Sequence, residues 1–178
     1  MSIDNQIIMR QMLVLLFLLS IKTSTTAQNQ VNMTVNQEAP VLQAREIYIN
    51  TSPERVWEVL THIENWGVWN ERIKKTTLQE ELKTGSVFTW KTNGSKIKSE
   101  IHTFNINRIL GWSGKTFGAR AVHNWYLEPT LSGTKVRVEE SMEGWAIKLM
   151  KKKMNRKLGD DMQYWLDQLK VESEKRLH

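Results

Sequence analysis

Residues 110–129 read LGWSGKTFGARAVHNWYLEP and predict two β-strands joined by a tight turn. On both sides of Phe117 and Gly118, large apolar side chains alternate with small or polar ones, and a period of two is typical of a half-buried strand. If these two residues form the tip of a hairpin, directly opposed residues share one face of the sheet. The pairs expected across this hairpin are Gly114–Ala121, Trp112–His123 and Leu110–Trp125.

A second turn, at Leu131 and Ser132, extends the pattern onto the next strand. The pairs expected across it are Leu127–Val136, Trp125–Val138 and His123–Glu140. One face is then mostly apolar and is predicted to point inward, with Leu110, Trp112, His123, Trp125, Leu127, Val136, Val138, Glu140 and Met142. The other face carries Ser113, Asn124, Lys135, Arg137 and Glu139. The inner face therefore combines many apolar residues with two polar ones.

The same period of two recurs on both sides of this region. Short connections between successive strands favour an antiparallel meander. The predicted strands cover 41–50, 74–82, 85–92, 96–106, 108–116, 120–129 and 134–142.

Helical periodicity appears near the start of this pattern and again after it. Ser52, Pro53 and Glu54 form a helix-start signal for residues 53–63, because they supply an N-cap, a proline at the first helical position and an acid at the positive helix end. A second short helix or turn is expected over 64–70, and one long helix from Glu143 to about Lys175.

This order of elements resembles the START-like superfamily known as SRPBCC, in its polyketide cyclase/dehydrase and lipid-transport branch. The resemblance covers about residues 42–175. It implies an α+β helix-grip fold, in which a curved antiparallel sheet wraps a long C-terminal helix around an internal cavity. Members bind lipids, hormones or polyketides, and some are enzymes. The segments that carry the resemblance are INTSPERVWEVLTHIENWGVWN (49–70), GSVFTWK (85–91), LGWSGKTFGARAVHNWYLEP (110–129) and GTKVRVEESMEGW (133–145).

Side chains that face the inside of the grip, most of them apolar, are the candidate ligand-binding residues. Aromatic and methionine side chains suit such a pocket, because they offer large apolar surfaces and, for methionine, adaptable shape. Trp57 is expected to pack under the sheet, and Trp66 and Trp69 either pack in the core or rim an opening. The candidates are Phe88, Trp90, Ile101, Leu110, Trp112, His123, Trp125, Val138, Glu140, Met142 and Met154.

His123 and Glu140 are the candidate catalytic pair. A buried carboxylate needs a partner, and an imidazole opposite it could also act with it as general acid and base on a bound carbonyl compound. We favour non-catalytic binding or transport of a hydrophobic or amphipathic small molecule, with a cyclase/dehydratase-type enzyme as the alternative. No metal site or cofactor is expected, because cysteine is absent and the histidines are not spaced like a metal motif.

The formal net charge of +6 is concentrated in part in KLMKKKMNRK (148–157). A solvated helix face is one interpretation, and a protein-binding module is another. The third is peripheral contact with an anionic membrane through Lys151, Lys152, Lys153 and Arg156. Nucleic acid is not an expected partner, because no aromatic-interleaved basic motif occurs. No pattern indicates an oligomeric state.

The apolar run MLVLLFLLSI (12–21) behind Arg10 predicts a secretory signal peptide that is cleaved after Ala27. An uncleaved anchor is the alternative. The expected organisation is a signal peptide (1–27), a flexible segment (28–40) and one START-like domain (41–178) of an exported protein.

Overall fold

The computed structural model describes residues 33–175. The predicted signal peptide and its cleavage after Ala27 lie outside the described residues, so export stays a prediction. Within the described part of the chain, no helix is long and apolar enough to cross a membrane. The elements are β1 (Val41–Ile49), α2 (Pro53–Thr61), a 3₁₀ turn η1 (Ile63–Asn65), α3 (Trp66–Trp69), β2 (Ile73–Leu78), β3 (Val87–Thr92), β4 (Ser95–Asn105), β5 (Ile109–Thr116), β6 (Ala119–Thr130), β7 (Gly133–Glu143), α4 (Trp145–Leu149) and α5 (Lys151–Ser173).

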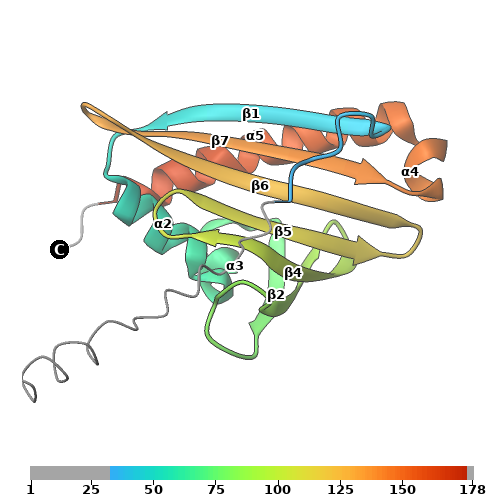
Figure 1. Ribbon diagram of the computed structural model, residues 1–178, viewed down its shortest axis with the longest axis horizontal. Coiled ribbons are helices and arrows are strands. Elements are labelled where there is room, and N and C mark those ends of the chain that lie inside the picture. Colours follow the sequence, from blue (N-terminus) through green and yellow to red (C-terminus); the bar gives the residue numbers. More distant parts are fainter. Residues whose placement is uncertain (1–32, 176–178) are drawn as a thin grey trace, which may run out of the picture.

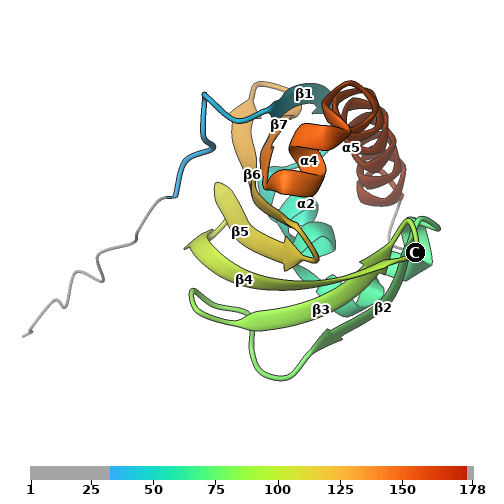
Figure 2. The same cartoon turned by 90° about the vertical axis from the view of Figure 1, so that its right-hand side faces the viewer.

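Seven antiparallel strands form one curved sheet in the order β1-β7-β6-β5-β4-β3-β2 (Figure 1). Figure 2 shows how the sheet bends around the side on which α5 lies. The short helices α2 and α3 contact both α5 and the sheet, so they lie inside the grip. The sheet is not closed, and β1 and β2 are its two edges. This arrangement confirms the predicted α+β helix-grip fold.

The register predicted for β5, β6 and β7 is confirmed. Trp112 pairs with His123, and His123 pairs with Glu140 on the next strand. Residues in alternate positions of a strand point to the same face, so the predicted inner face follows from these pairs. Six of its apolar members are buried, and Met142 is partly exposed. The six are Leu110, Trp112, Trp125, Leu127, Val136 and Val138.

Residues 33–40, the last part of the predicted flexible segment, are packed on the outer face of the sheet. The Asn124 side-chain amide donates to the Met33 carbonyl oxygen at 3.0 Å, and the Asn36 backbone N–H donates to Ser141 Oγ at 3.1 Å. Val35 is buried between these two contacts. These residues therefore cover β6 and β7, and they explain why Asn124 is buried although it points away from the core.

The single final helix expected from Glu143 to about Lys175 is two helices. The chain turns at Met150, whose φ of −111° and ψ of 23° are not helical. The physical reason is packing, because α4 contacts β6 and β7 whereas α5 contacts β1, and one straight helix does not reach both places. The strand expected over 74–82 is also shorter, since β2 ends at Leu78.

Candidate ligand-binding site

An aromatic cluster fills the centre of the grip, between the sheet and α5. Trp66 on α3 is fully buried, and its indole N–H donates to the Leu60 carbonyl oxygen at 2.9 Å. The ring centroid of Trp66 lies 5.2 Å from that of Trp165 on α5 and 5.5 Å from that of Trp112 on β5. Phe88 and Trp90 of β3 surround the same ring. Trp66 is therefore a core residue and does not rim an opening.

His123 is the polar residue next to this cluster. Its ring lies flat on Trp112, with centroids 4.5 Å apart and planes 9° apart. Its Nδ1 lies 2.5 Å from Glu140 Oε2, and the Glu140 side chain keeps 15% of its surface exposed. If Nδ1 donates to the carboxylate, the neutral ring presents Nε2 as an acceptor. The strand register produces this pair, and Trp112 fixes the orientation of the ring.

Three buried ring nitrogens near this pair have no hydrogen-bond partner within residues 33–175. They are His123 Nε2, Trp125 Nε1 and Trp165 Nε1. Their rings contact one another, with centroid distances of 5.5 Å for His123–Trp125, 5.8 Å for His123–Trp165 and 5.5 Å for Trp125–Trp165. Buried polar atoms are almost always hydrogen-bonded, and leaving one unpaired costs about 1–3 kcal/mol. Two indole donors and one imidazole acceptor match the bonding capacity of a hydroxyl group.

The sequence reasoning missed Trp66 and Trp165 as neighbours of the candidate site. Trp165 stands at helical spacing from Met162 and Leu169, so the pattern placed it on the buried side of the helix without indicating what it contacts.

Of the eleven candidate ligand-binding residues predicted from the sequence, Glu140, Met142 and Met154 are partly exposed and the others are buried. Their contact with a ligand stays a prediction.

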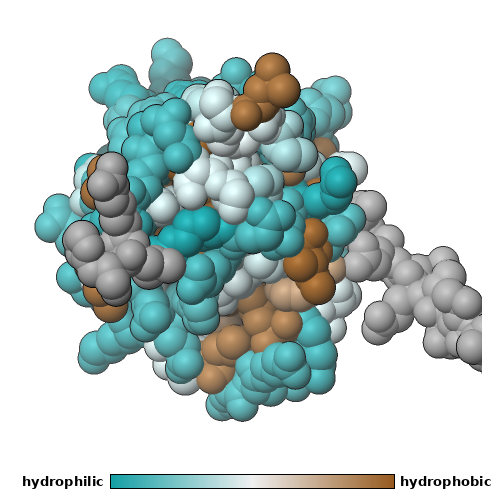
Figure 3. Space-filling model, turned by 90° about the vertical axis from the view of Figure 1, so that its left-hand side faces the viewer, coloured by the Kyte–Doolittle hydropathy of each residue, from teal (hydrophilic) through white to brown (hydrophobic). Residues whose placement is uncertain are grey.

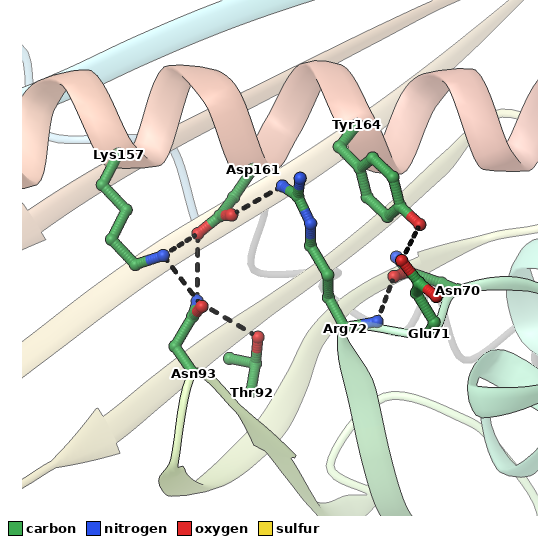
Figure 4. A network of polar contacts seen from close by, with 8 residues as sticks. All are labelled: Asn70, Glu71, Arg72, Thr92, Asn93, Lys157, Asp161 and Tyr164. Carbon is green, nitrogen blue, oxygen red and sulfur yellow. Dashed lines mark hydrogen bonds and ion pairs between the residues drawn. The ribbon is translucent and has the colours of Figure 1, made fainter.

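A polar bridge joins α5 to the part of the sheet formed by β2, β3 and β4 (Figure 4). Asp161 accepts hydrogen bonds at 3.0 Å from Arg72, just before β2, and at 3.0 Å from Asn93, in the turn between β3 and β4. Lys157 donates to Asn93 at 2.8 Å and lies 3.2 Å from Asp161. The Arg72 guanidinium also stacks on the Tyr164 ring at 3.7 Å.

The bridge is part of a surface cleft of about 630 Å³ along α5. Three of the four cations predicted to contact a membrane, Lys152, Lys153 and Arg156, line this cleft. A second surface cleft, of about 660 Å³, lies at the α4 end of the molecule and includes Trp145, Lys148 and Lys115. Both clefts are at the surface, whereas the space expected for an internal cavity holds the aromatic cluster.

The family model described as polyketide cyclase / dehydrase and lipid transport matches residues 43–174. The chain belongs to this family. Membership of the polyketide cyclase/dehydrase family confirms the resemblance seen in the sequence and agrees with the helix-grip fold described above. No curated protein matches this member of the family.

Solved structures share its fold at low sequence identity. A hypothetical protein from Helicobacter pylori superposes with a TM-score of 0.71 at 19% identity, covering 80% of this chain and 97% of the other. An aromatase/cyclase from Streptomyces gives a TM-score of 0.67 at 13% identity, with 77% and 95% covered. A START superfamily protein from Mycobacterium smegmatis gives 0.66 at 13% identity, with 75% and 97% covered.

The three described histidines of this polyketide cyclase/dehydrase family member, His62, His102 and His123, do not gather around one point. Among the described residues, no group of three or more histidine, aspartate or glutamate side chains could hold a metal ion. His102 lies on the outer face, where Nδ1 is 2.8 Å from Thr103 Oγ1. His123 lies on the inner face, so the two rings are separated by the sheet.

Proposed function

We propose that this domain binds a hydrophobic or amphipathic small molecule, lipid-like or polyketide-like, without covalent chemistry, and that an oxygen of the ligand is hydrogen-bonded to His123. The observation that carries the proposal is the group of unpaired nitrogens on His123, Trp125 and Trp165. They lie in an apolar core, where His123 is paired with the Glu140 carboxylate.

The chemistry of these nitrogens favours a ligand with a hydroxyl or enol group. Such a group donates to His123 Nε2 and accepts from an indole N–H, so it satisfies atoms that each cost about 1–3 kcal/mol when unpaired. The surrounding rings of Trp112 and Trp165 give flat apolar surfaces. Ligand sites in proteins commonly combine such apolar walls with a few placed polar groups.

Entry of the ligand requires movement, because the aromatic side chains are in mutual contact. The α5 cleft supports one route, since Asn93 follows Trp90 by three residues and Asp161 precedes Trp165 by one helical turn. Opening the bridge around Asp161 would uncover the contact between these two tryptophans, whose ring centroids lie 5.7 Å apart. The exposed polar bridge is weak enough for this, because surface ion pairs contribute about 0–1 kcal/mol each.

Binding is tested by native mass spectrometry of protein purified gently from its own host, together with tryptophan fluorescence titrations of the ligand-free protein. The titrations use fatty acids, sterols, isoprenoids and aromatic polyketides. We expect a hydroxylated ligand to change the fluorescence and to add mass to the protein. No response to any of these classes, in protein shown to be free of ligand, would refute the proposal.

The variant His123→Phe tests the polar contact, because it keeps a ring on Trp112 and removes both nitrogens. We expect the affinity for a hydroxylated ligand to fall about tenfold or more, since one buried hydrogen bond is lost. Trp125→Phe removes a single indole N–H and serves as a second variant if the first unfolds. Ser113→Ala on the outer face is the control, and equal affinities for all these proteins would place the ligand elsewhere.

One observation favours an enzyme of the cyclase/dehydratase type as the second candidate. The 2.5 Å contact between His123 Nδ1 and Glu140 orients the ring and leaves Nε2 for a substrate, as required for general acid–base catalysis. In an enzyme, Glu140→Gln binds substrate nearly normally and loses about 10²–10⁴-fold in turnover. In a binding protein, single-turnover assays with a bound ligand give no product for the parent protein or for Glu140→Gln.

A further inference from the structure

Four large apolar side chains are exposed together at one end of the molecule. They lie on α4, just after it, and at the tip of the β5–β6 hairpin, and this end is at the right of Figure 1 and faces the viewer in Figure 2. We call them the α4 patch. Its members and their exposed fractions are Phe117 (86%), Trp145 (58%), Leu149 (77%) and Met150 (46%).

The α4 patch is built by defined contacts. The rings of Phe117 and Trp145 meet edge to face, with centroids 5.6 Å apart. The Ala146 backbone N–H donates to the Gly118 carbonyl oxygen at 3.2 Å, which ties α4 to the hairpin tip. A Cβ on Gly118 would lie 2.7 Å from the Trp145 ring, so the ring rests directly on that glycine. Trp145 and Leu149 are four residues apart and share one side of α4.

The helix exposes these residues because another residue holds it in place. Ile147 of α4 is buried against the core, with 3% of its surface exposed. The apolar side chains of α4 therefore point in two directions, one group toward the core and the other toward solvent. Large contiguous apolar patches are rare on the surface of monomeric proteins, and they commonly mark interaction sites.

Lysines surround the α4 patch on both sides. Lys115 and Lys148 line the cleft at the α4 end, and Lys152 and Lys153 line the cleft along α5. Lys151 stands between them at the start of α5. Within residues 33–175, none of these five lysines forms an ion pair with a carboxylate, whereas Arg120 nearby is paired with Glu143. Within this part of the chain, these lysines are therefore free of direct ion pairs, although the pKa of Glu143, lowered chiefly by its hydrogen bond with Arg120, is also lowered by nearby Lys148.

Among the described residues, the opposite end of the molecule lacks this combination of a cluster that contains two aromatic rings and lysines without ion pairs. Figure 3 shows that end as mostly hydrophilic, with separate hydrophobic areas. Leu131, in the β6–β7 turn, is more exposed than any member of the α4 patch, at 108%. It is a single apolar side chain at a hairpin tip, which is an ordinary feature of a protein surface.

We propose that the α4 patch is a docking surface for an anionic lipid membrane. Aromatic and aliphatic side chains enter the boundary between headgroups and acyl chains, and the lysines bind the anionic headgroups around them. A lipid surface fits the patch because it offers both an apolar interior for the exposed apolar side chains and anionic headgroups for the lysines. A second copy of this basic chain would bring the same lysines face to face, which is unfavourable.

The chain has no cysteine, so a single environment-sensitive label can be placed at will. The full chain carrying Leu149→Cys is labelled with the fluorophore NBD and titrated with vesicles of phosphatidylcholine and phosphatidylglycerol in equal amounts. We expect a blue shift and an increase in NBD emission. The control is Leu131→Cys with the same label, which stays in water at the opposite end and does not shift.

Three results would overturn the proposal. The first is no shift at position 149, or equal shifts at positions 149 and 131. The second is an equal shift at 149 with vesicles of phosphatidylcholine alone, because the lysines would then have no role. The third is a shift without lipid that grows with protein concentration, which would identify a second copy as the occupant.

Charge is tested on the same labelled protein. The double change Lys151→Gln and Lys152→Gln removes two cations next to the patch and alters no buried contact. We expect the partition coefficient onto the anionic vesicles to fall about tenfold or more, because each basic residue near the surface contributes to binding. Raising the salt concentration has the same effect on the parent protein. Unchanged binding in both experiments would contradict docking by these lysines.

Discussion

Trp112 of β5 and His123 of β6 are stacked face to face across two neighbouring strands, 4.5 Å apart at their ring centroids. The stack holds the imidazole so that Nδ1 meets Glu140 and Nε2 stays within the core. The side-chain geometry of the candidate site therefore depends on strand register, because a slip of one residue would send all three side chains to the other face.

Glu140 is expected to stabilise the fold through its contact with His123. Glu140→Gln keeps the shape and the hydrogen-bonding capacity, so it should leave the free energy of unfolding nearly unchanged. Glu140→Ala leaves a void and an imidazole without its partner, and should lower that free energy by roughly 1–3 kcal/mol. Urea denaturation of the two variants measures the difference. Identical midpoints for Glu140→Ala and the parent protein would show that the contact contributes nothing.

His102 should make stability depend on pH. Burial lowers the pKa of His102 from its ordinary value to about 4, and the nearby His123 acts in the same direction. Between pH 6.5 and 4 the unfolded chain takes up a proton at this residue and the folded chain does not. The free energy of unfolding is therefore highest above pH 6.5 and falls as the pH drops toward 4, by up to roughly 2–3 kcal/mol.

Denaturation at several pH values measures this dependence. His102→Gln should lose this part of the slope between pH 6.5 and 4, whereas His62→Gln, at an exposed residue, should keep it. If the two variants have the same slope as the parent protein, His102 is protonated in the folded state and its pKa is not lowered.

Gly111 of β5 should not tolerate a side chain. A Cβ there would lie 2.4 Å from Asn124 Oδ1 and 2.5 Å from His102 Cε1, and both neighbours are buried. Gly111→Ala should lower the free energy of unfolding by about 1–3 kcal/mol through overpacking. Gly114→Ala on the same strand is the matched control, because its Cβ would meet atoms at 3.2 Å. Thermal melts should therefore rank Gly111→Ala well below Gly114→Ala.

Trp66 should contribute more to stability than an exposed tryptophan. Trp66→Phe removes the hydrogen bond to the Leu60 carbonyl oxygen and leaves a void among Trp112, Trp165 and Phe88. We expect a loss of roughly 1–3 kcal/mol. Trp145→Phe, on the protein surface, should change the free energy of unfolding by less than about 0.5 kcal/mol. Similar losses for the two variants would mean that Trp66 is not the centre of the core.

The register of the three central strands could be predicted because each strand alternates strictly and both turns contain a glycine or small polar residues. Such local patterns specify which residues oppose one another, and they placed His123 opposite Glu140. They also specified which side is apolar. The central part of the candidate site could be predicted for this reason, because Trp112, His123 and Glu140 lie on neighbouring strands.

The contacts of Trp66 and Trp165 could not be predicted in the same way. These residues are about 100 positions apart, and α3 has only four residues, too few for a periodic pattern. The break between α4 and α5 was missed for a related reason. No proline or glycine lies between Trp145 and Leu158, and Ile147, Met150 and Met154 keep helical spacing across the break. Tertiary contacts with different strands decide where the chain turns.

The open edge of the sheet at β2 has a consequence for solubility. An edge strand offers unpaired backbone groups to which a strand of another molecule can add, which is a route to aggregation. In β2 the pairing with β3 is interrupted between Lys74 and Thr77, and Lys75 has a φ of 51°. The irregular backbone and the two charged side chains there oppose the addition of a further strand. The sheet can therefore stay open and curve around α5 without adding strands from other molecules at this edge.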